Sequence, residues 1–180
     1  MSEFEYLAVL LSIVFGLAIT QLLSGTVRLF YEDRIDDVRL AWALAIAIAL
    51  IINWWGFFQW RGAEEWRFEL YAFLMAWATF HYALAATLFP RDLAGRIEPE
   101  RERRVFLVVL LVFIGIDIIE AGLREALFSP WYFLPSMASW ALAVSVALVV
   151  RREWVERLAA WYMFLSFLFF ALAARRLLQT

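Results

Sequence analysis

Long apolar stretches, separated by short polar connections, run along the whole chain. A helix needs roughly 20 mostly apolar residues to cross a hydrocarbon core about 30 Å thick, and six stretches approach or exceed that length. They cover residues 4–30, 40–60, 68–89, 105–128, 135–150 and 158–178. The pattern therefore predicts an all-α, polytopic membrane protein with six transmembrane helices.

The fourth stretch is the least regular, because charged residues occupy its second half. Its apolar first half, VFLVVLLVFIGI, would reach only about 18 Å as a helix, so the charged half must complete the crossing. The alternative is a helix that bends out near Glu120 and continues along the interface, since a charge inside the membrane is costly.

Composition narrows the class of protein further. Hydrophobic residues make up 65% of the 180 residues and the mean hydropathy is +0.74, so we expect a single bundle over residues 1–180, surrounded by lipid. The chain has no cysteine and one histidine, His81, which excludes thiolate and multi-histidine metal sites within one chain. A net charge of −2 does not indicate the basic surface that a nucleic-acid-binding protein needs. We expect no metal, no cofactor and no nucleic-acid partner.

Arginine is unevenly distributed between the two sides of the predicted bundle. Of 16 basic residues, all arginine, eleven lie in the loops after the first, third and fifth spans and five lie on the opposite side. Cytoplasmic loops carry the excess of positive charge, so we expect the eleven to face the cytoplasm and both termini to lie outside. Trp54, Trp55, Trp60 and Trp131 near the predicted outer ends suit the headgroup layer.

The two halves of the chain share a segment. Residues 42–52 read WALAIAIALII and residues 140–150 read WALAVSVALVV, and Gly16 aligns with Gly115, which pairs Gln21 with Glu120. Each half, residues 1–89 and 105–180 joined by a linker over 90–104, holds three spans, so the second half must enter the membrane from the other side. This predicts a 3+3 inverted repeat. Chance similarity between helices rich in alanine and leucine is the alternative.

Candidate chemistry concentrates on the fourth span. Asp117, Glu120 and Arg124 are spaced to share one face of a helix. Charge at that depth costs about 2.5–3.5 kcal/mol, so such residues face a bundle interior or a watery cavity. Glu120 and Arg124 form a favourable i,i+4 pair, which would leave Asp117 unpaired and able to carry a proton or hold a cation. The alternative is a polar staple, with Asp117 accepting hydrogen bonds from neighbouring helices.

Other polar residues within the spans have two interpretations each. His81 could relay protons to Asp117, although a neutral imidazole hydrogen-bonded across the bundle is the favoured interpretation. Gln21 and Asn53 are neutral and typically join helices. The repeat also places Gln21 opposite Glu120, so Gln21 could line the same cavity.

Small residues recur every four positions in the first span, at Ser12, Gly16, Thr20 and Ser24. Such a stripe lets helices approach closely and predicts helix packing. The sequence leaves open whether the packing lies within one chain or between the chains of a homodimer or higher homo-oligomer.

The opening segment FEYLAVLLSIVFGLAITQLLSG, residues 4–25, resembles the start of a family of uncharacterised six-span bacterial membrane proteins. The resemblance covers the first span only and brings no catalytic residue with it. It implies a multi-pass protein of the bacterial cytoplasmic (inner) membrane, with both termini then periplasmic.

Charge at depth and the internal repeat together predict a small channel or transporter for an ion, a proton or a small solute. Its polar site would lie near the bilayer midplane, at Asp117, Glu120 and Arg124 with Gln21 and His81 nearby. The alternative is a membrane scaffold or accessory subunit that binds a partner protein, in which the polar cluster would be sealed and fully paired. A membrane-embedded enzyme ranks third, because one histidine and one acidic cluster offer few catalytic groups. The chain also lacks a phosphate-binding glycine loop, an HExxH motif and a serine nucleophile elbow, and we expect no enzymatic activity.

Overall fold

The computed structural model describes residues 2–31, 35–63, 65–90, 98–128 and 130–177, without the side chains of residues 173–177. Within this part the chain forms helices and no strands. They are α1 (Glu3–Leu29), α2 (Asp37–Phe57) with the short 3-10 helix η1 (Phe58–Gly62) after it, α3 (Phe68–Leu88), α4 (Pro99–Leu123), α5 (Phe133–Val150) and α6 (Glu153–Leu177). Six helices are long and apolar enough to cross a membrane, which confirms the all-α, six-span prediction.

Local sequence explains where the first helices begin. Ser2 caps α1 through a capping box, in which its hydroxyl accepts from Glu5 N at 3.2 Å and the Glu5 carboxylate accepts from Ser2 N at 2.9 Å. Asp36 caps α2 by accepting from the backbone N–H groups of Val38 and Arg39, both at 3.1 Å. The caps satisfy donors that the first helical turn leaves free.

The fourth span differs from its prediction at both ends. Pro99 and two glutamates in the first turn suit a helix N-terminus, so α4 begins before the predicted 105. Residues 98–104 of the predicted linker are therefore at or within the start of α4, while residues 91–97 lie outside the described residues. α4 ends at Leu123, before the predicted 128 and without a bend at Glu120, because Glu125 takes a left-handed conformation (φ 58°) and Ala126 N donates to Ala121 O at 2.8 Å.

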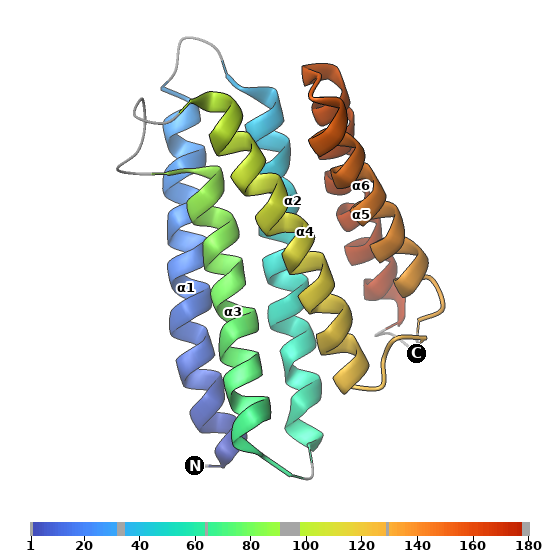
Figure 1. The fold of residues 1–180 in the computed structure, drawn as a ribbon. Coiled ribbons are helices and arrows are strands. Elements are labelled where there is room, and N and C mark those ends of the chain that lie inside the picture. Colours follow the sequence, from blue (N-terminus) through green and yellow to red (C-terminus); the bar gives the residue numbers. More distant parts are fainter. Residues whose placement is uncertain (1, 32–34, 64, 91–97, 129, 178–180) are drawn as a thin grey trace.

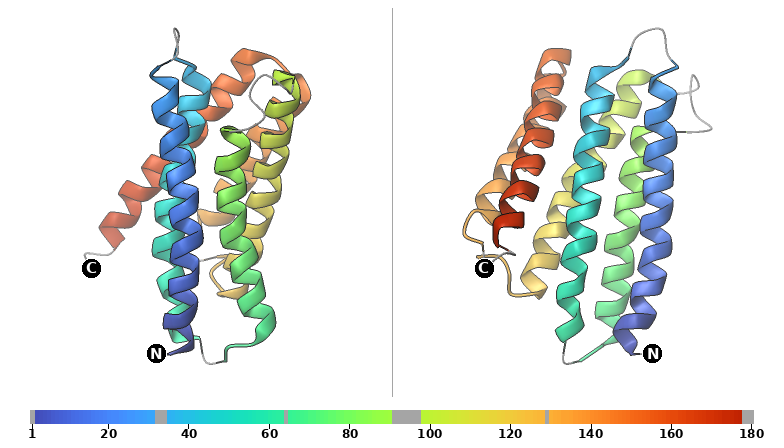
Figure 2. Two further views of the ribbon diagram at one scale, coloured as in Figure 1. Left: turned by 90° about the vertical axis from the view of Figure 1, so that its left-hand side faces the viewer. Right: turned by 180° about the vertical axis from the view of Figure 1, so that it is seen from behind.

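The helices pack as a ring in the order α1, α3, α4, α5, α6, α2, and α2 also contacts α3. Figure 1 shows α1, α2 and α3 on one side and the α5–α6 pair on the other, with α4 crossing between them. Figure 2 shows that α6 is strongly tilted relative to α1. Five helices, α2 to α6, therefore surround an interior that α1 does not reach.

The two ends of the ring have different chemistry. α1 begins and α6 ends at one end, here named the terminal end (Figure 1). The other end carries the turns after α1, α3 and α5 and is named the arginine-rich end. Most of the chain's arginines flank those turns.

The packing does not repeat between the two halves. α1 packs closely along α3, whereas α4 and α6, their counterparts in a 3+3 repeat, have no comparable contact. The inverted repeat stays a prediction.

The C-terminus of α3 is fixed against α1. Gln21 Nε2 donates to Phe89 O at 2.6 Å, and Gly25 lies directly against the ring of Phe89. A Cβ at residue 25 would overlap that ring and lie 2.7 Å from Phe89 Cβ, whereas a Cβ at Gly16 would meet nothing within 4 Å. Gly25, which is buried, is therefore the small residue that brings α1 and α3 together.

We predict that Gly25→Ala destabilises the protein by about 1–3 kcal/mol, the usual cost of overpacking, although alanine is the better helix former by about 1 kcal/mol. Gly16→Ala is the matched control, and it should leave the free energy of unfolding equal or raise it. Unfolding by denaturant in micelles measures both. Adding Phe89→Ala should reduce the cost of Gly25→Ala; equal costs with and without Phe89 would contradict the packing described here.

Candidate functional site

Asp117 lies on α4 between two neutral hydrogen-bond donors from neighbouring helices. Its Oδ1 accepts from Trp77 Nε1 of α3 at 2.7 Å, and Asn53 Nδ2 of α2 lies 3.2 Å from its Oδ2. In the part of the chain that is described, Asp117 makes no ion pair. A carboxylate offers about four acceptor positions, so these two donors leave capacity for a further partner.

His81 is linked to Asp117 through two intermediate residues, Asn53 and Trp77. Its Nδ1 lies 3.0 Å from Trp77 O and its Nε2 lies 3.0 Å from Asn53 Nδ2. A carbonyl only accepts, so Nδ1 carries the proton and Nε2 accepts from the amide. The ring is fully buried against Phe15, Trp77 and Phe113. This geometry matches the favoured interpretation, a neutral imidazole that joins helices.

Glu120 and Arg124 form the predicted ion pair, and both side chains find all their partners within the cluster. Arg124 Nε lies 2.6 Å from Glu120 Oε1 and Arg124 Nη2 lies 2.7 Å from Oε2, a bidentate arrangement. Trp60 Nε1 donates to Oε1 at 2.8 Å, and the third guanidinium nitrogen of Arg124 donates to Gln59 at 2.6 Å. The two charges neutralise each other, so Asp117 is the acidic group of this cluster that lacks a counter-ion.

A cavity of about 280 Å³, here named the terminal cavity, lies beside Asp117 toward the terminal end. Asn53, Gln59, Asp117 and Arg124 contribute its polar lining, from α2, η1, α4 and the turn after α4. Side chains of α5 and α6 and of the connection before α5 form the opposite wall. The Asp117 side chain therefore borders a space large enough for a small molecule.

From Asp117 toward the arginine-rich end, the interior narrows to an apolar constriction. The free space there is only about 10 Å³, roughly the minimum that holds one water molecule. Ile46, Leu110 and Phe113 are among its buried lining residues, and Trp42 and Trp140 border it. Trp42 Nε1 is buried and lacks a hydrogen-bond partner in the described part of the chain, which leaves one donor unsatisfied beside the constriction.

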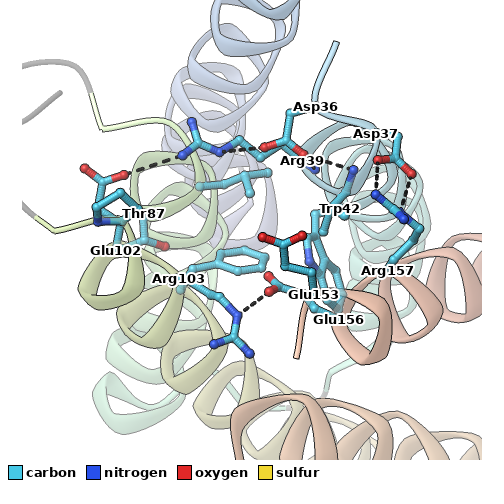
Figure 3. A pocket seen from close by; sticks show the side chains of 14 residues that line it. Asp36, Asp37, Arg39, Trp42, Thr87, Glu102, Arg103, Glu153, Glu156 and Arg157 are labelled. Carbon is cyan, nitrogen blue, oxygen red and sulfur yellow. Dashed lines mark hydrogen bonds and ion pairs between the residues drawn. The ribbon is translucent and has the colours of Figure 1, made fainter. Parts of the chain in front are cut away.

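A second large cavity, here named the vestibule, occupies the arginine-rich end and has a volume of about 430 Å³ (Figure 3). Ion pairs join the three helices around it: Arg39 to Glu102, from α2 to α4, at 3.6 Å; Arg157 to Asp37, from α6 to α2, at 2.9 Å; and Arg103 to Glu156, from α4 to α6. Five carboxylates and three guanidinium groups line the vestibule. Its lining therefore carries two more negative than positive charges.

The vestibule, the constriction and the terminal cavity follow one another along the interior. Trp42 lines both the vestibule and the constriction, and Asp117, Met137, Trp140 and Phe167 line both the constriction and the terminal cavity. Along α2 the lining residues progress from 36–42 through 42–49 to 52–59, and along α4 from 99–106 through 110–117 to 117–124. The three spaces therefore follow one another between α2, α4 and α6, and the middle one is by far the smallest.

The structure separates some residues that the sequence analysis grouped. Gln21 lies away from Asp117 and holds the end of α3 near the arginine-rich end, so the expectation that it lines the same cavity is wrong. Asp117 lies six residues before the end of α4, about 9 Å along the axis. It is therefore halfway between the middle of the helix and its end, and not near the middle as predicted.

The predicted packing stripe of the first span does not pack within the chain. Ser12, Gly16, Thr20 and Ser24 are all exposed on α1, because the buried face of that helix is formed by Leu11, Phe15, Ala18, Leu22 and Gly25. Packing of the stripe between chains stays a prediction. No group of three or more metal-ligating side chains is present among the residues that the structure describes.

Trp60, Trp77 and Gln59 complete the polar cluster and were not predicted as part of it. Each supplies a neutral side-chain group to Asp117, Glu120 or Arg124 from 40 to 65 residues away in the sequence. Trp60 lies near a span end, where tryptophan usually indicates an interfacial anchor. Trp77 lies in the middle of α3, and no local pattern in the sequence distinguishes it or Gln59 as a donor. Only the packing of α2, α3 and α4 brings them to the carboxylates.

We predict that Arg124→Gln destabilises the protein by about 3–5 kcal/mol, because Glu120 would keep a buried charge without its cation. The double variant Glu120→Gln with Arg124→Gln should recover most of that loss. Arg67→Gln, which breaks the exposed pair with Glu65, is the control and should cost less than about 1 kcal/mol. If the double variant is as unstable as Arg124→Gln in denaturant unfolding, Glu120 and Arg124 do not compensate each other's charge.

Comparison with protein-family models, curated proteins and solved structures found no match. The resemblance of residues 4–25 to the opening of a bacterial membrane-protein family therefore stays a prediction.

Proposed function

We propose that this protein is a small channel or transporter of the bacterial inner membrane that moves an ion, a proton or a small solute along the path between α2, α4 and α6. Its termini face the periplasm and its vestibule faces the cytoplasm, as the arginine distribution favours. The solute enters the terminal cavity, contacts Asp117 and reaches the vestibule through the constriction.

The observation that carries this proposal is the alignment of three spaces through the bundle. A membrane protein that only packs with a partner needs no cavity at each end of one interior path. Here two cavities of about 280 and 430 Å³ are separated only by a short apolar segment. Hydrophobic constrictions of this kind close conduction paths by excluding water.

Two polar groups along the path that are not fully satisfied support the same interpretation. Asp117 borders both the terminal cavity and the constriction and has no counter-ion in the described chain. Trp42 Nε1 is buried and unsatisfied at the other end of the constriction. A buried polar group that lacks hydrogen-bond partners lowers the stability of the fold. A water molecule or solute that passes along the path would provide a partner for both groups.

The inverted repeat is part of the proposal. The shared segments lie on α2 and α5, and their first residues, Trp42 and Trp140, both border the constriction. Trp42 also borders the vestibule and Trp140 also borders the terminal cavity. Equivalent residues at opposite ends of a shared site are typical of transporters built from inverted repeats.

One observation favours the second candidate function, a scaffold or accessory subunit that binds a partner protein or a second copy. The stripe of Ser12, Gly16, Thr20 and Ser24 is exposed along α1, and Gly16 has open space beside it. Small residues on an exposed face allow another helix to approach closely. In this case the purified protein would conduct nothing.

We predict that Asp117→Asn abolishes pH- or cation-dependent flux in liposomes without changing assembly. The amide keeps the size of the side chain but loses the charge that a cation or proton would meet. Glu69→Gln, at an exposed carboxylate in the first turn of α3, is the matched control and should conduct like the unmodified protein. Unchanged flux in Asp117→Asn would remove Asp117 from the mechanism.

We predict that Ile46→Ala increases flux, because Ile46 is buried in the wall of the constriction and truncation widens it. Ile51→Ala on the same helix is the matched control, since Ile51 is 66% exposed. Both variants are compared in liposomes at equal protein content, after gel filtration has shown equal assembly. If Ile46→Ala and Ile51→Ala conduct alike, the path does not run through the constriction.

A further inference from the structure

We infer that the terminal cavity binds a small organic cation, an ammonium group carrying apolar substituents. This inference rests on the proposed transport function and names the class of solute. It is drawn from three properties of the cavity: an aromatic wall, one uncompensated carboxylate opposite that wall, and too few oxygen ligands for a bare metal ion.

The wall formed by α5, α6 and the residue before α5 is aromatic. Two ring pairs span it: Tyr132 with Phe170, whose centroids are 5.6 Å apart, and Trp140 with Phe167, whose centroids are 4.3 Å apart. Phe133 adds a fifth ring to the same lining. Aromatic faces attract cations, and cages of such rings are the recurring recognition device for alkylated ammonium groups.

The charge that faces this wall is negative. Asp117 and Asn53 line the side of the cavity formed by α4 and α2. Arg124 also lines the cavity, but Glu120 holds it in a bidentate pair, so these two charges cancel. One carboxylate charge from Asp117 therefore remains, and an ammonium group placed between Asp117 and the rings would contact both.

The lining argues against an inorganic cation as the principal solute. Hard cations such as Ca²⁺ need six to eight oxygen ligands to replace their water, and most of the residues around the cavity are apolar or aromatic. An alkylated ammonium is weakly hydrated and needs only a counter-charge and an apolar surface. The volume of about 280 Å³ is close to the lower end of small-molecule sites, roughly 300–1,000 Å³.

The far end of the path fits the same solute class. The vestibule has five carboxylates against three guanidinium groups, and Glu153 makes no ion pair among the residues described there. In Figure 3 its carboxylate carries no contact line, unlike those of Asp37, Glu102 and Glu156. A cavity lined by excess negative charge concentrates cations.

The test is calorimetric titration of the intact purified protein with choline chloride, with tetraethylammonium chloride as a larger cation. The neutral isostere of choline, 3,3-dimethyl-1-butanol, is titrated in parallel. We expect saturable binding of a cation and at least roughly tenfold weaker binding of the isostere. Asp117→Asn should lose cation binding, and Phe167→Leu should weaken it roughly tenfold.

Phe169→Leu is the matched control for Phe167→Leu, because Phe169 is 74% exposed on the same helix and does not line the cavity. It should bind the cations like the unmodified protein. Equal effects of the two substitutions, equal binding of choline and its isostere, or full cation binding by Asp117→Asn would each overturn the inference. Absence of binding for both cations would overturn it as well.

Flux in liposomes separates this inference from the proposed function. Cation binding that depends on Asp117 and Phe167, without any flux, would support the site and contradict the transport function. Proton or sodium flux abolished by Asp117→Asn, with no binding of either organic cation, would support transport and overturn the organic-cation site. Choline flux inhibited by tetraethylammonium would support both.

Discussion

A carboxylate inside a helical bundle, held by neutral donors instead of a cation, is the constraint around which this structure is organised. Asp117 obtains one hydrogen bond from α3 and a weaker one from α2, so three helices must meet at one level. The nearby Arg124 forms a bidentate ion pair with Glu120 and not with Asp117. The Asp117 carboxyl group, which has no counter-ion, borders the terminal cavity.

In the proposed path, apolar packing is the main interaction that holds the constriction together. The ion pairs around the vestibule involve partly exposed groups such as Arg157 with Asp37 and Arg39 with Glu102, and pairs of this kind contribute about 0–1 kcal/mol each. Burying one large apolar side chain contributes about 1.5–3 kcal/mol, and Ile46, Leu110 and Phe113 are all buried at the constriction. Opening the proposed path would therefore require the helices around the constriction to separate, whereas the two partly exposed ion pairs can exchange with water at little cost.

Much of the fold could be predicted from the sequence, because span length and helical spacing are local properties. The six spans and the Glu120–Arg124 pair follow from runs of apolar residues and an i,i+4 spacing. The partners of Asp117 could not be predicted, since Trp77 and Asn53 reach it through tertiary packing alone. The stripe on α1 was identified correctly as a pattern, but spacing alone does not distinguish its exposed face from the face that packs through Gly25.

The central claim is that position 117 faces a water-accessible cavity open toward the terminal end. The chain has no cysteine, so a single Asp117→Cys variant can be reacted in oriented vesicles with a membrane-impermeant methanethiosulfonate reagent. Ile119→Cys, at a position 54% exposed on the outer face of the same helix, is the lipid-facing control. We predict that Cys at 117 reacts from the side of the termini and Cys at 119 does not. No reaction at 117 from either side would contradict the account.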